Sequence, residues 1–193
     1  SMAKIFAYHQ GRWAVYKAPV YPVPANRIIL QNSQSDQIWV AGYKSKVLLL
    51  DFSTEQWLTY ENLSFQCEVA PDEELFLERN NRLIHRKGIT WTSYGVEDGL
   101  MDAPIRVLKT SKGQIWAAGS HQGYAATALY VDGRWERHIH RELSWGIDYR
   151  AVFEAQDGAL WFGGAVDGEK VDGFSRWVVL LPNLEAKGRS WVP

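Results

Sequence analysis

The stretch that decides the fold is PIRVLKTSKGQIWAAGSHQGYAATALYVDGRWERHI, which runs from Pro104 to Ile139. It contains four short runs of aliphatic, β-branched and aromatic residues, and polar, Gly-containing segments separate them. The last two runs are joined by Asp-Gly, which is a strong signal for a β-hairpin turn. Within the last run, Trp135, Arg137 and Ile139 would share one face of a strand. The stretch therefore predicts four consecutive antiparallel strands.

Two aromatic motifs repeat along the whole chain at spacings of about 40 residues. The chain has 10 tryptophans, and most of them belong to one of two interleaved series. The first series marks the expected fourth strand of each unit, and its members are Trp13, Trp57, Trp91, Trp135 and Trp177. The second marks the expected second strand, and its members are Trp39, Phe76, Trp116, Trp161 and Trp191. Four-stranded units at this period predict an all-β fold, a β-propeller in which each blade covers its neighbour.

The two ends of the chain look like complementary halves of one unit. KIFAYHQGRWAVY (4–16) matches a third and a fourth strand, whereas NLEAKGRSWVP (183–193) matches a first strand, a turn and a second strand. We therefore expect a five-bladed β-propeller of four-stranded blades, closed where the N-terminal outer strands pair with the C-terminal inner strands; closure removes exposed sheet edges. The alternative is a fragment of a larger propeller. Residues 3–193 are expected to form a single domain, after an expression scar at residues 1–2.

Composition excludes several classes of partner. The net charge of −1 gives no electrostatic footprint for nucleic acid, and the apolar runs are too short for membrane insertion. The single cysteine, Cys67, excludes an internal disulfide. We expect a soluble monomer, cytoplasmic if Met2 is the native start and periplasmic if a signal peptide was removed.

One part of the chain resembles a known repeat family. WTSYGVEDGLMDAPIRVLKTSKGQIWAAG (91–119) and AQDGALWFGG (155–164) are similar to the two-component-regulator propeller repeat, which combines a W-x-x-[YF] strand end, a D-G-L loop and G-x-[IL]-W. The D-G-L loop occurs once, at residues 98–100. The resemblance implies a propeller and, since such repeats usually build extracytoplasmic sensor domains of hybrid histidine kinases, a sensor role.

The candidate site is expected on one face of the propeller, where the loops between blades and the loops between second and third strands meet. The longest of these loops are predicted at 119–125, 140–148 and 163–171, and function favours loops that exceed the length needed to connect strands. The ligand-binding candidates in these loops and in the one around the D-G-L motif are His121, Gln122, Tyr124, Trp145, Asp148, Arg150, Asp167, Tyr94 and Asp98. Trp145 would offer a platform for a flat ligand; the alternative is that it only packs its loop against a blade.

Catalytic and metal sites are weakly encoded. His138 and His140 could chelate zinc from one face of a strand, but no third ligand follows by spacing, so neither a metal nor a cofactor is predicted. The inner strands contribute only Glu68 and Glu154, which does not match a glycosidase. The function predicted is a non-catalytic binding or sensor module for a small molecule, glycan or protein. The alternatives are a propeller enzyme, such as a lyase or glycosidase, and a sugar-binding lectin.

Overall fold

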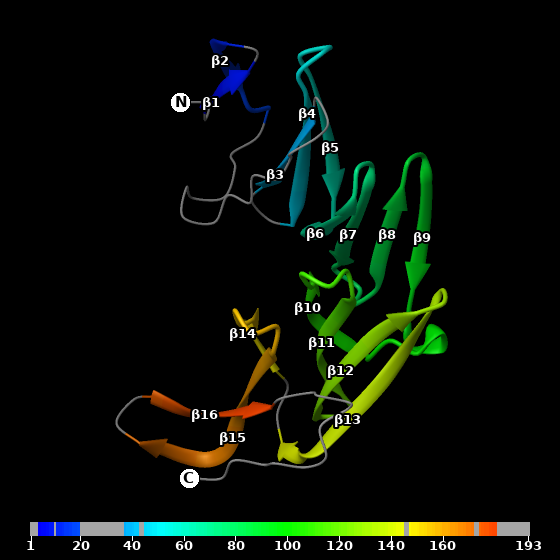
Figure 1. Ribbon diagram of the computed structural model, residues 1–193, viewed down its shortest axis with the longest axis vertical. Coiled ribbons are helices and arrows are strands. Elements are labelled where there is room, and N and C mark those ends of the chain that lie inside the picture. Colours follow the sequence, from blue (N-terminus) through cyan, green and yellow to red (C-terminus); the bar gives the residue numbers. More distant parts are fainter. Residues whose placement is uncertain are drawn as a thin grey trace.

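The computed structural model is all-β apart from the short 3-10 turn η2 (Val96–Asp98) (Figure 1). It describes residues 4–9, 11–19, 37–42, 45–144, 147–171 and 174–180, and the structural statements below concern these residues. They form five antiparallel sheets: β1-β2, β3-β4-β5, β6-β7-β8-β9, β10-β11-β12-β13 and β14-β15-β16. The strands are β1 (Lys4–His9), β2 (Arg12–Lys17), β3 (Gln37–Gly42), β4 (Lys46–Asp51), β5 (Gln56–Glu61), β6 (Leu63–Ala70), β7 (Glu73–Glu78), β8 (Leu83–Lys87), β9 (Thr90–Tyr94), β10 (Ala103–Lys109), β11 (Ile115–His121), β12 (Tyr124–Val131), β13 (Arg134–Ser144), β14 (Ile147–Glu154), β15 (Leu160–Val171) and β16 (Phe174–Leu180).

The unit that decided the sequence interpretation folds as predicted. Strands β10 to β13 pair in chain order as one antiparallel sheet, and β6 to β9 form a second sheet of the same kind. The predicted Asp-Gly hairpin joins β12 to β13, and both turn residues, Asp132 and Gly133, have positive φ. This is the backbone that a two-residue turn of type I′ requires.

The sheets follow one another along an arc, and an apolar cluster fills each interface between successive sheets (Figure 1). Ile5 packs with Val40 and Leu48 between the first and second sheets. The other three interfaces hold larger clusters, which contain Trp39, Trp135 and Trp116 respectively. Because each sheet buries its faces against its neighbours, the arrangement is β-propeller-like.

The aromatic series on the second strands marks these interfaces, with one correction. Trp39 faces the following sheet, where its ring lies 5.0 Å from that of Phe76, and Trp116 faces Phe162 at 6.2 Å. The comparison of the repeats within this sequence places Phe76 at the position that corresponds to Trp39, and this is wrong by one residue. Leu75 faces the following sheet and Phe76 the preceding one, because adjacent residues on a strand point to opposite faces.

The long loop predicted at 119–125 is wrong. Strand β11 continues to His121 and β12 begins at Tyr124, so the connection is a turn of Gln122 and Gly123. Both turn residues have positive φ, 52° and 83°, which lets the chain reverse within two residues. Polar and small residues in this segment therefore extend the hairpin and do not form a loop.

Two further loop predictions also give way to strands. Most of the segment 140–148 belongs to β13, which continues to Ser144 beyond a register shift against β12. The segment 163–171 lies in β15. Trp177, placed by its motif on a fourth strand, lies on β16 and pairs with Ala165 of β15, so it belongs to the third strand of its sheet.

The two ends of the arc remain open in the described residues. No described sheet combines strands from both ends, and the predicted composite blade depends on 183–193, which lie outside the described residues. The count of five blades and the ring closure are therefore not confirmed. One face of β1-β2 is apolar and open to solvent; its side chains are Phe6 (65% exposed), Tyr8 (64%), Trp13 (73%) and Val15 (52%).

Candidate functional site

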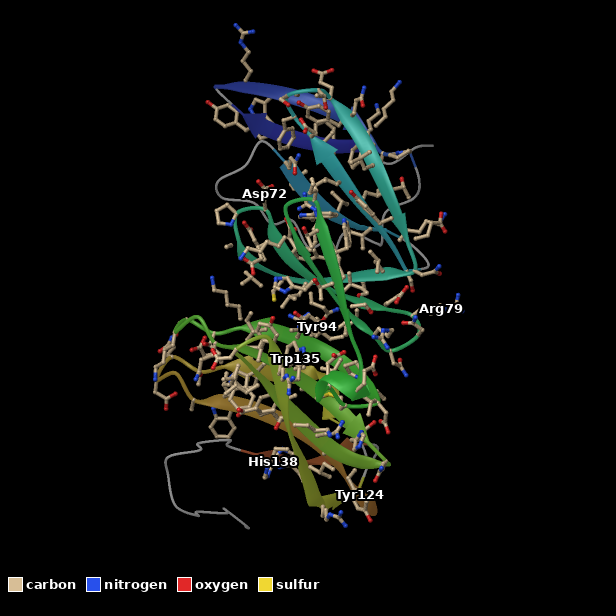
Figure 2. The ribbon with its side chains drawn as sticks, turned by 90° about the vertical axis from the view of Figure 1, so that its right-hand side faces the viewer. Asp72, Arg79, Tyr94, Tyr124, Trp135 and His138 are labelled. Carbon is tan, nitrogen blue, oxygen red and sulfur yellow. The ribbon has the colours of Figure 1, made fainter. Side chains whose placement is uncertain are left out.

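The predicted functional face corresponds to one edge of the sheets, here called the turn edge. It comprises the links between sheets and the turns between second and third strands, which contain Ser45, Asn62, Arg79, Asp102 and Gln122. Figure 2 shows Arg79 and Tyr124 toward one side of the molecule and Asp72, from the opposite edge, toward the other. The links differ in length: Asn62 alone separates β5 from β6, whereas residues 95–102 separate β9 from β10.

A pocket of about 270 Å³ opens on the turn edge, where three sheets meet. Its apolar wall consists of Leu77, Pro104 and Ile105. The remaining lining residues are polar or charged, namely Ser45, Asn62, Ser64, Gln66, Glu78 and Arg79. The volume lies just under the range of about 300–1,000 Å³ typical of sites for drug-sized ligands, so the pocket suits a smaller molecule.

Gln66 is the buried polar group of this pocket, and the fold fixes its orientation. Its Oε1 accepts a hydrogen bond of 3.1 Å from the backbone N–H of Val107 on the neighbouring sheet. Because an N–H can only donate, the amide cannot be flipped, and Nε2 must point the other way. Nε2 then donates to the carbonyl and to the hydroxyl oxygen of Ser64, at 3.3 Å each. The Ser64 hydroxyl thus receives a hydrogen bond and keeps its own proton to donate.

Two opposite charges lie side by side in the lining, at the end of β7. The Arg79 backbone N–H donates to the carbonyl of Asn62 at 2.9 Å, which fixes the turn. Among the described residues, neither the Glu78 carboxylate nor the Arg79 guanidinium has an ion-pair partner. No ion pair with a described residue therefore competes with a bound molecule for either charge.

Sequence reasoning named the loops of this pocket but selected none of its residues. The predicted face consists of loops between blades and loops between second and third strands, and the segments 42–46, 61–64 and 78–81 are predicted as loops of these two kinds. These segments are short, so a criterion based on loop length does not select their residues. Gln66 could have been found as a polar residue within the apolar inner strand LSFQCEVA, since a buried amide needs a specific partner.

Three of the predicted residues meet at the neighbouring turn of the same edge. His121 is buried, and its Nδ1 accepts a hydrogen bond of 3.2 Å from the backbone N–H of Asp102. The neutral imidazole therefore carries its proton on Nε2. The Gln122 backbone N–H donates to Asp102 Oδ2 at 2.8 Å. Tyr124 is partly exposed, with the Arg141 guanidinium 5.9 Å from its ring centre.

Tyr94 and Asp98, predicted as ligand contacts, make structural contacts. The Tyr94 hydroxyl lies 2.8 Å from that of Tyr130, and burial raises the pKa of Tyr94. Asp98 Oδ2 accepts a hydrogen bond of 2.9 Å from the Gly95 backbone N–H, which caps η2. The D-G-L loop thus serves packing in this structure, and Leu100 in it is fully buried.

The other predicted residues are not brought together by anything described. Trp145 lies outside the described residues. Asp148 and Arg150 lie on β14 and Asp167 on β15, and only their backbone is described. Ligand binding by these residues, by the three at the neighbouring turn, and by Tyr94 and Asp98 stays a prediction.

The histidine pair lies together as the strand spacing requires. The rings of His138 and His140 are 4.6 Å apart, and His140 Nε2 lies 3.0 Å from the Thr127 hydroxyl. Within the described part of the chain, no three His, Cys, Asp or Glu side chains gather in a way that could hold a metal ion.

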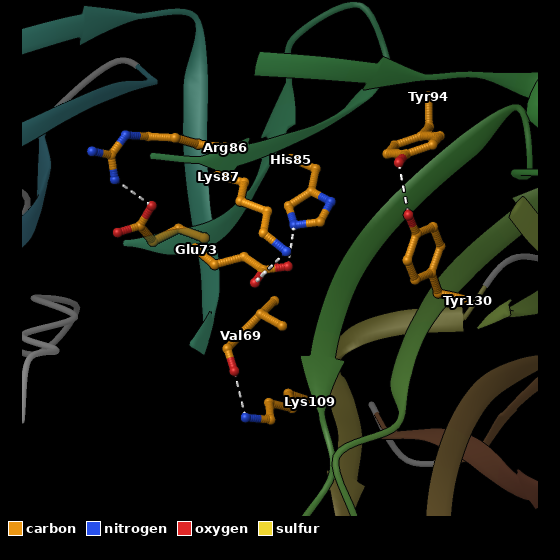
Figure 3. A network of polar contacts seen from close by, with 9 residues as sticks. Val69, Glu73, His85, Arg86, Lys87, Tyr94, Lys109 and Tyr130 are labelled. Atoms are coloured by element: carbon orange, nitrogen blue, oxygen red, sulfur yellow. Dashed lines mark hydrogen bonds and ion pairs between the residues drawn. The ribbon is translucent and has the colours of Figure 1, made fainter. Parts of the chain in front are cut away.

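The opposite edge carries a second group of charged residues, and several of them are paired with one another (Figure 3). Glu73 binds His85 at 2.8 Å and also lies 3.6 Å from Lys87. At the buried interface beside it, Glu74 accepts hydrogen bonds from Arg86 at 2.6 Å and from the Trp39 indole N–H at 3.0 Å. These pairs join strands and neighbouring sheets.

Comparison with known proteins supports the fold. No family model matches the chain, and no curated protein sequence matches it either. Among solved structures, it is similar to the extracellular domain of a putative hybrid two component system from B. thetaiotaomicron, with a TM-score of 0.54 and 14% sequence identity. The match covers 89% of this chain and 24% of the other, so this chain spans about a quarter of that domain. At this identity the likeness shows the fold alone. No helix in the described residues is long and apolar enough to cross a membrane.

Proposed function

We propose that this chain is a non-catalytic ligand-binding module of the sensor type, and that it binds a small molecule in the pocket of the turn edge. The observation that carries the proposal is the lining of that pocket. It combines an apolar wall with a fixed amide, Gln66, and with two charges, Glu78 and Arg79, that lack ion-pair partners among the described residues. A mostly apolar concavity with a few oriented polar groups is the usual form of a small-molecule site.

The similar solved structure supports the sensor role by analogy of fold. It is described as an extracellular domain of a two component system, which also supports an extracytoplasmic setting for this chain. The residues at the neighbouring turn, His121, Gln122 and Tyr124, would extend the site along the same edge. Trp145, Asp148, Arg150 and Asp167 stay candidates for that extension.

A thermal-shift panel of sugars, nucleotides, amino acids and divalent metals tests the proposal. A ligand at about 100 times its dissociation constant adds about 2.7 kcal/mol to the free energy of unfolding. For a chain of this size, that should raise Tm by about 5–11 °C. The Ser64→Trp variant fills the pocket, and Thr92→Trp is its control on an exposed strand position.

A shift lost in Ser64→Trp and kept in Thr92→Trp is the expected result. If every hit survives in both variants, the site lies elsewhere and the proposal fails. If the protein chemically converts a compound that it binds, the proposal of a non-catalytic module is wrong and the protein is an enzyme. If sugar binding saturates at about one equivalent per sheet, the protein has one site on each sheet, as a lectin does, and the proposal of a single site is wrong.

We also propose that the sheets close into a five-bladed ring. The open apolar face of β1-β2 supports closure, because the corresponding faces of the inner sheets are covered by a neighbour. Trp13 occupies the repeat position of Trp135, which is buried against the preceding sheet. At the other end of the arc, Phe153 is exposed and stacks on Trp161. The two open ends are therefore the two halves of one repeat interface.

A further inference from the structure

We propose that the pocket of the turn edge takes an α-amino acid with an aliphatic side chain; this inference rests on the proposed function. Three features of the lining specify the three parts of such a ligand: hydrogen-bond donors for its carboxylate, an acidic group for its ammonium and an apolar wall for its side chain. Each feature comes from residues whose surroundings the structure describes.

The donors belong to Arg79 and Ser64. A guanidinium offers N–H groups in a fork that matches a carboxylate. The Ser64 hydroxyl adds a further donor in a fixed direction of hydrogen bonding, because the N–H of Val107 orients Gln66 and Gln66 in turn donates to Ser64. This chain of hydrogen bonds begins at a backbone N–H of another sheet. The polarity of the hydroxyl is thus set by the fold and does not depend on a bound molecule.

The acidic group is Glu78, the residue next to Arg79. A simple carboxylate in this pocket would be repelled by Glu78, and a simple amine would be repelled by Arg79. A zwitterion satisfies both charges. The absence of any ion pair between either charge and another described residue means that no existing interaction has to be broken first.

The apolar wall sets the third part of the ligand. Leu77, Pro104 and Ile105 line the pocket and come from two different sheets. A charged or strongly polar side chain placed against this wall would lose its hydration without gaining partners. An aliphatic side chain instead gains from the removal of apolar surface from water. The volume of about 270 Å³ suits a molecule of the size of a single amino acid.

Calorimetric titration with three related compounds tests the inference on the whole chain. L-leucine carries both charges, leucinamide lacks the carboxylate, and N-acetyl-L-leucine lacks the ammonium. We expect leucine to bind at least about tenfold more tightly than either analogue, since each analogue gives up a charge-assisted hydrogen bond that leucine makes.

Two variants assign the charges. Arg79→Gln should weaken the binding of leucine and N-acetyl-L-leucine about tenfold and should not weaken that of leucinamide, whose ammonium it no longer repels. Glu78→Gln should weaken the binding of leucine and leucinamide and should not weaken that of N-acetyl-L-leucine, whose carboxylate it no longer repels. Arg134→Gln and Glu136→Gln are controls at exposed positions of β13 and should change none of the three affinities.

The outcomes separate this inference from the function on which it rests. Equal binding of all three compounds, or no binding of leucine while another ligand is lost in Ser64→Trp, overturns the amino-acid assignment and keeps the pocket as a binding site. If no ligand of the wider panel is lost in Ser64→Trp, the proposed function fails as well. Weaker binding of every compound in both charge variants would mean that the variants disturb the pocket as a whole, and that result also overturns the assignment.

Discussion

Replacing Gly99 with alanine should destabilise the fold well beyond the same replacement at Gly133. Gly99 is the central residue of the D-G-L loop, with φ of 89°, and Gly133 lies in the hairpin turn between β12 and β13, with φ of 86°. An alanine in this left-handed region costs about 1–2 kcal/mol at either position. The two variants therefore share the backbone penalty and differ only in what the new methyl group meets.

At Gly99 the new Cβ would lie 1.9 Å from the carbonyl oxygen of Trp135 and 2.9 Å from its carbonyl carbon, whereas at Gly133 it would meet nothing within 4 Å. A carbon and an oxygen that are not bonded need more than 3 Å, so the loop or β13 must move by over about 1 Å. Trp135 and Leu100 are both buried in the same cluster, and forcing extra volume into a packed core costs about 1–3 kcal/mol. We expect a total of about 2–5 kcal/mol for Gly99→Ala and about 1–2 kcal/mol for Gly133→Ala.

Urea unfolding followed by tryptophan fluorescence measures both variants against the unchanged protein, and the midpoints together with the slopes give the free energies. If Gly99→Ala and Gly133→Ala agree within about 0.5 kcal/mol, the close approach of the loop to Trp135 does not exist in solution, and the packing of the β10–β13 sheet against the D-G-L loop is wrong.

Three more perturbations follow from contacts described above. Gln66→Leu should cost about 1–3 kcal/mol in urea unfolding, because the Val107 N–H loses its acceptor; no loss would show that this bond is absent. Burial raises the pKa of Glu68 in the folded protein. The contribution of this residue to the stability of the fold is therefore fully present below its ordinary pKa of 4.5, where the carboxyl is protonated, and is lost as pH rises through the raised pKa. Glu68→Gln should therefore have the higher Tm at about pH 7 and no advantage at about pH 3, and an equal Tm at both values would contradict the shift. Trp13→Ser should lower Tm by several degrees if the ring closes, and an unchanged Tm would leave that face uncovered.

Periodicity made the fold readable where the units are regular. The unit that forms β10 to β13 has Gly, Asp and Ser at its turns and aliphatic runs between them. Its strands could therefore be placed from residue types alone. Phe76 was misplaced because hydrophobic size does not reveal strand phase: Leu75 and Phe76 are both apolar and both buried. Only the packing of the two neighbouring sheets decides which one faces the following blade.

The candidate site was harder to predict than the fold. The loop at 119–125 looked long because its residues are small and polar, yet Gln122 and Gly123 adopt positive φ and close the hairpin in two residues. The pocket instead arises where short connections from three sheets converge. Such convergence depends on the angles between sheets, and no local sequence pattern records those angles.

That convergence has a mechanical consequence. Ser45, Gln66 and Pro104 belong to three successive sheets, each held rigid by its own ladder of hydrogen bonds, and all three touch the same small volume. A molecule bound there would set the spacing between rigid sheets. A ligand of another size would change the angle between neighbouring sheets. The displacement that results would increase with distance from the pocket. The strands farthest from the pocket would then move most when one ligand replaces another.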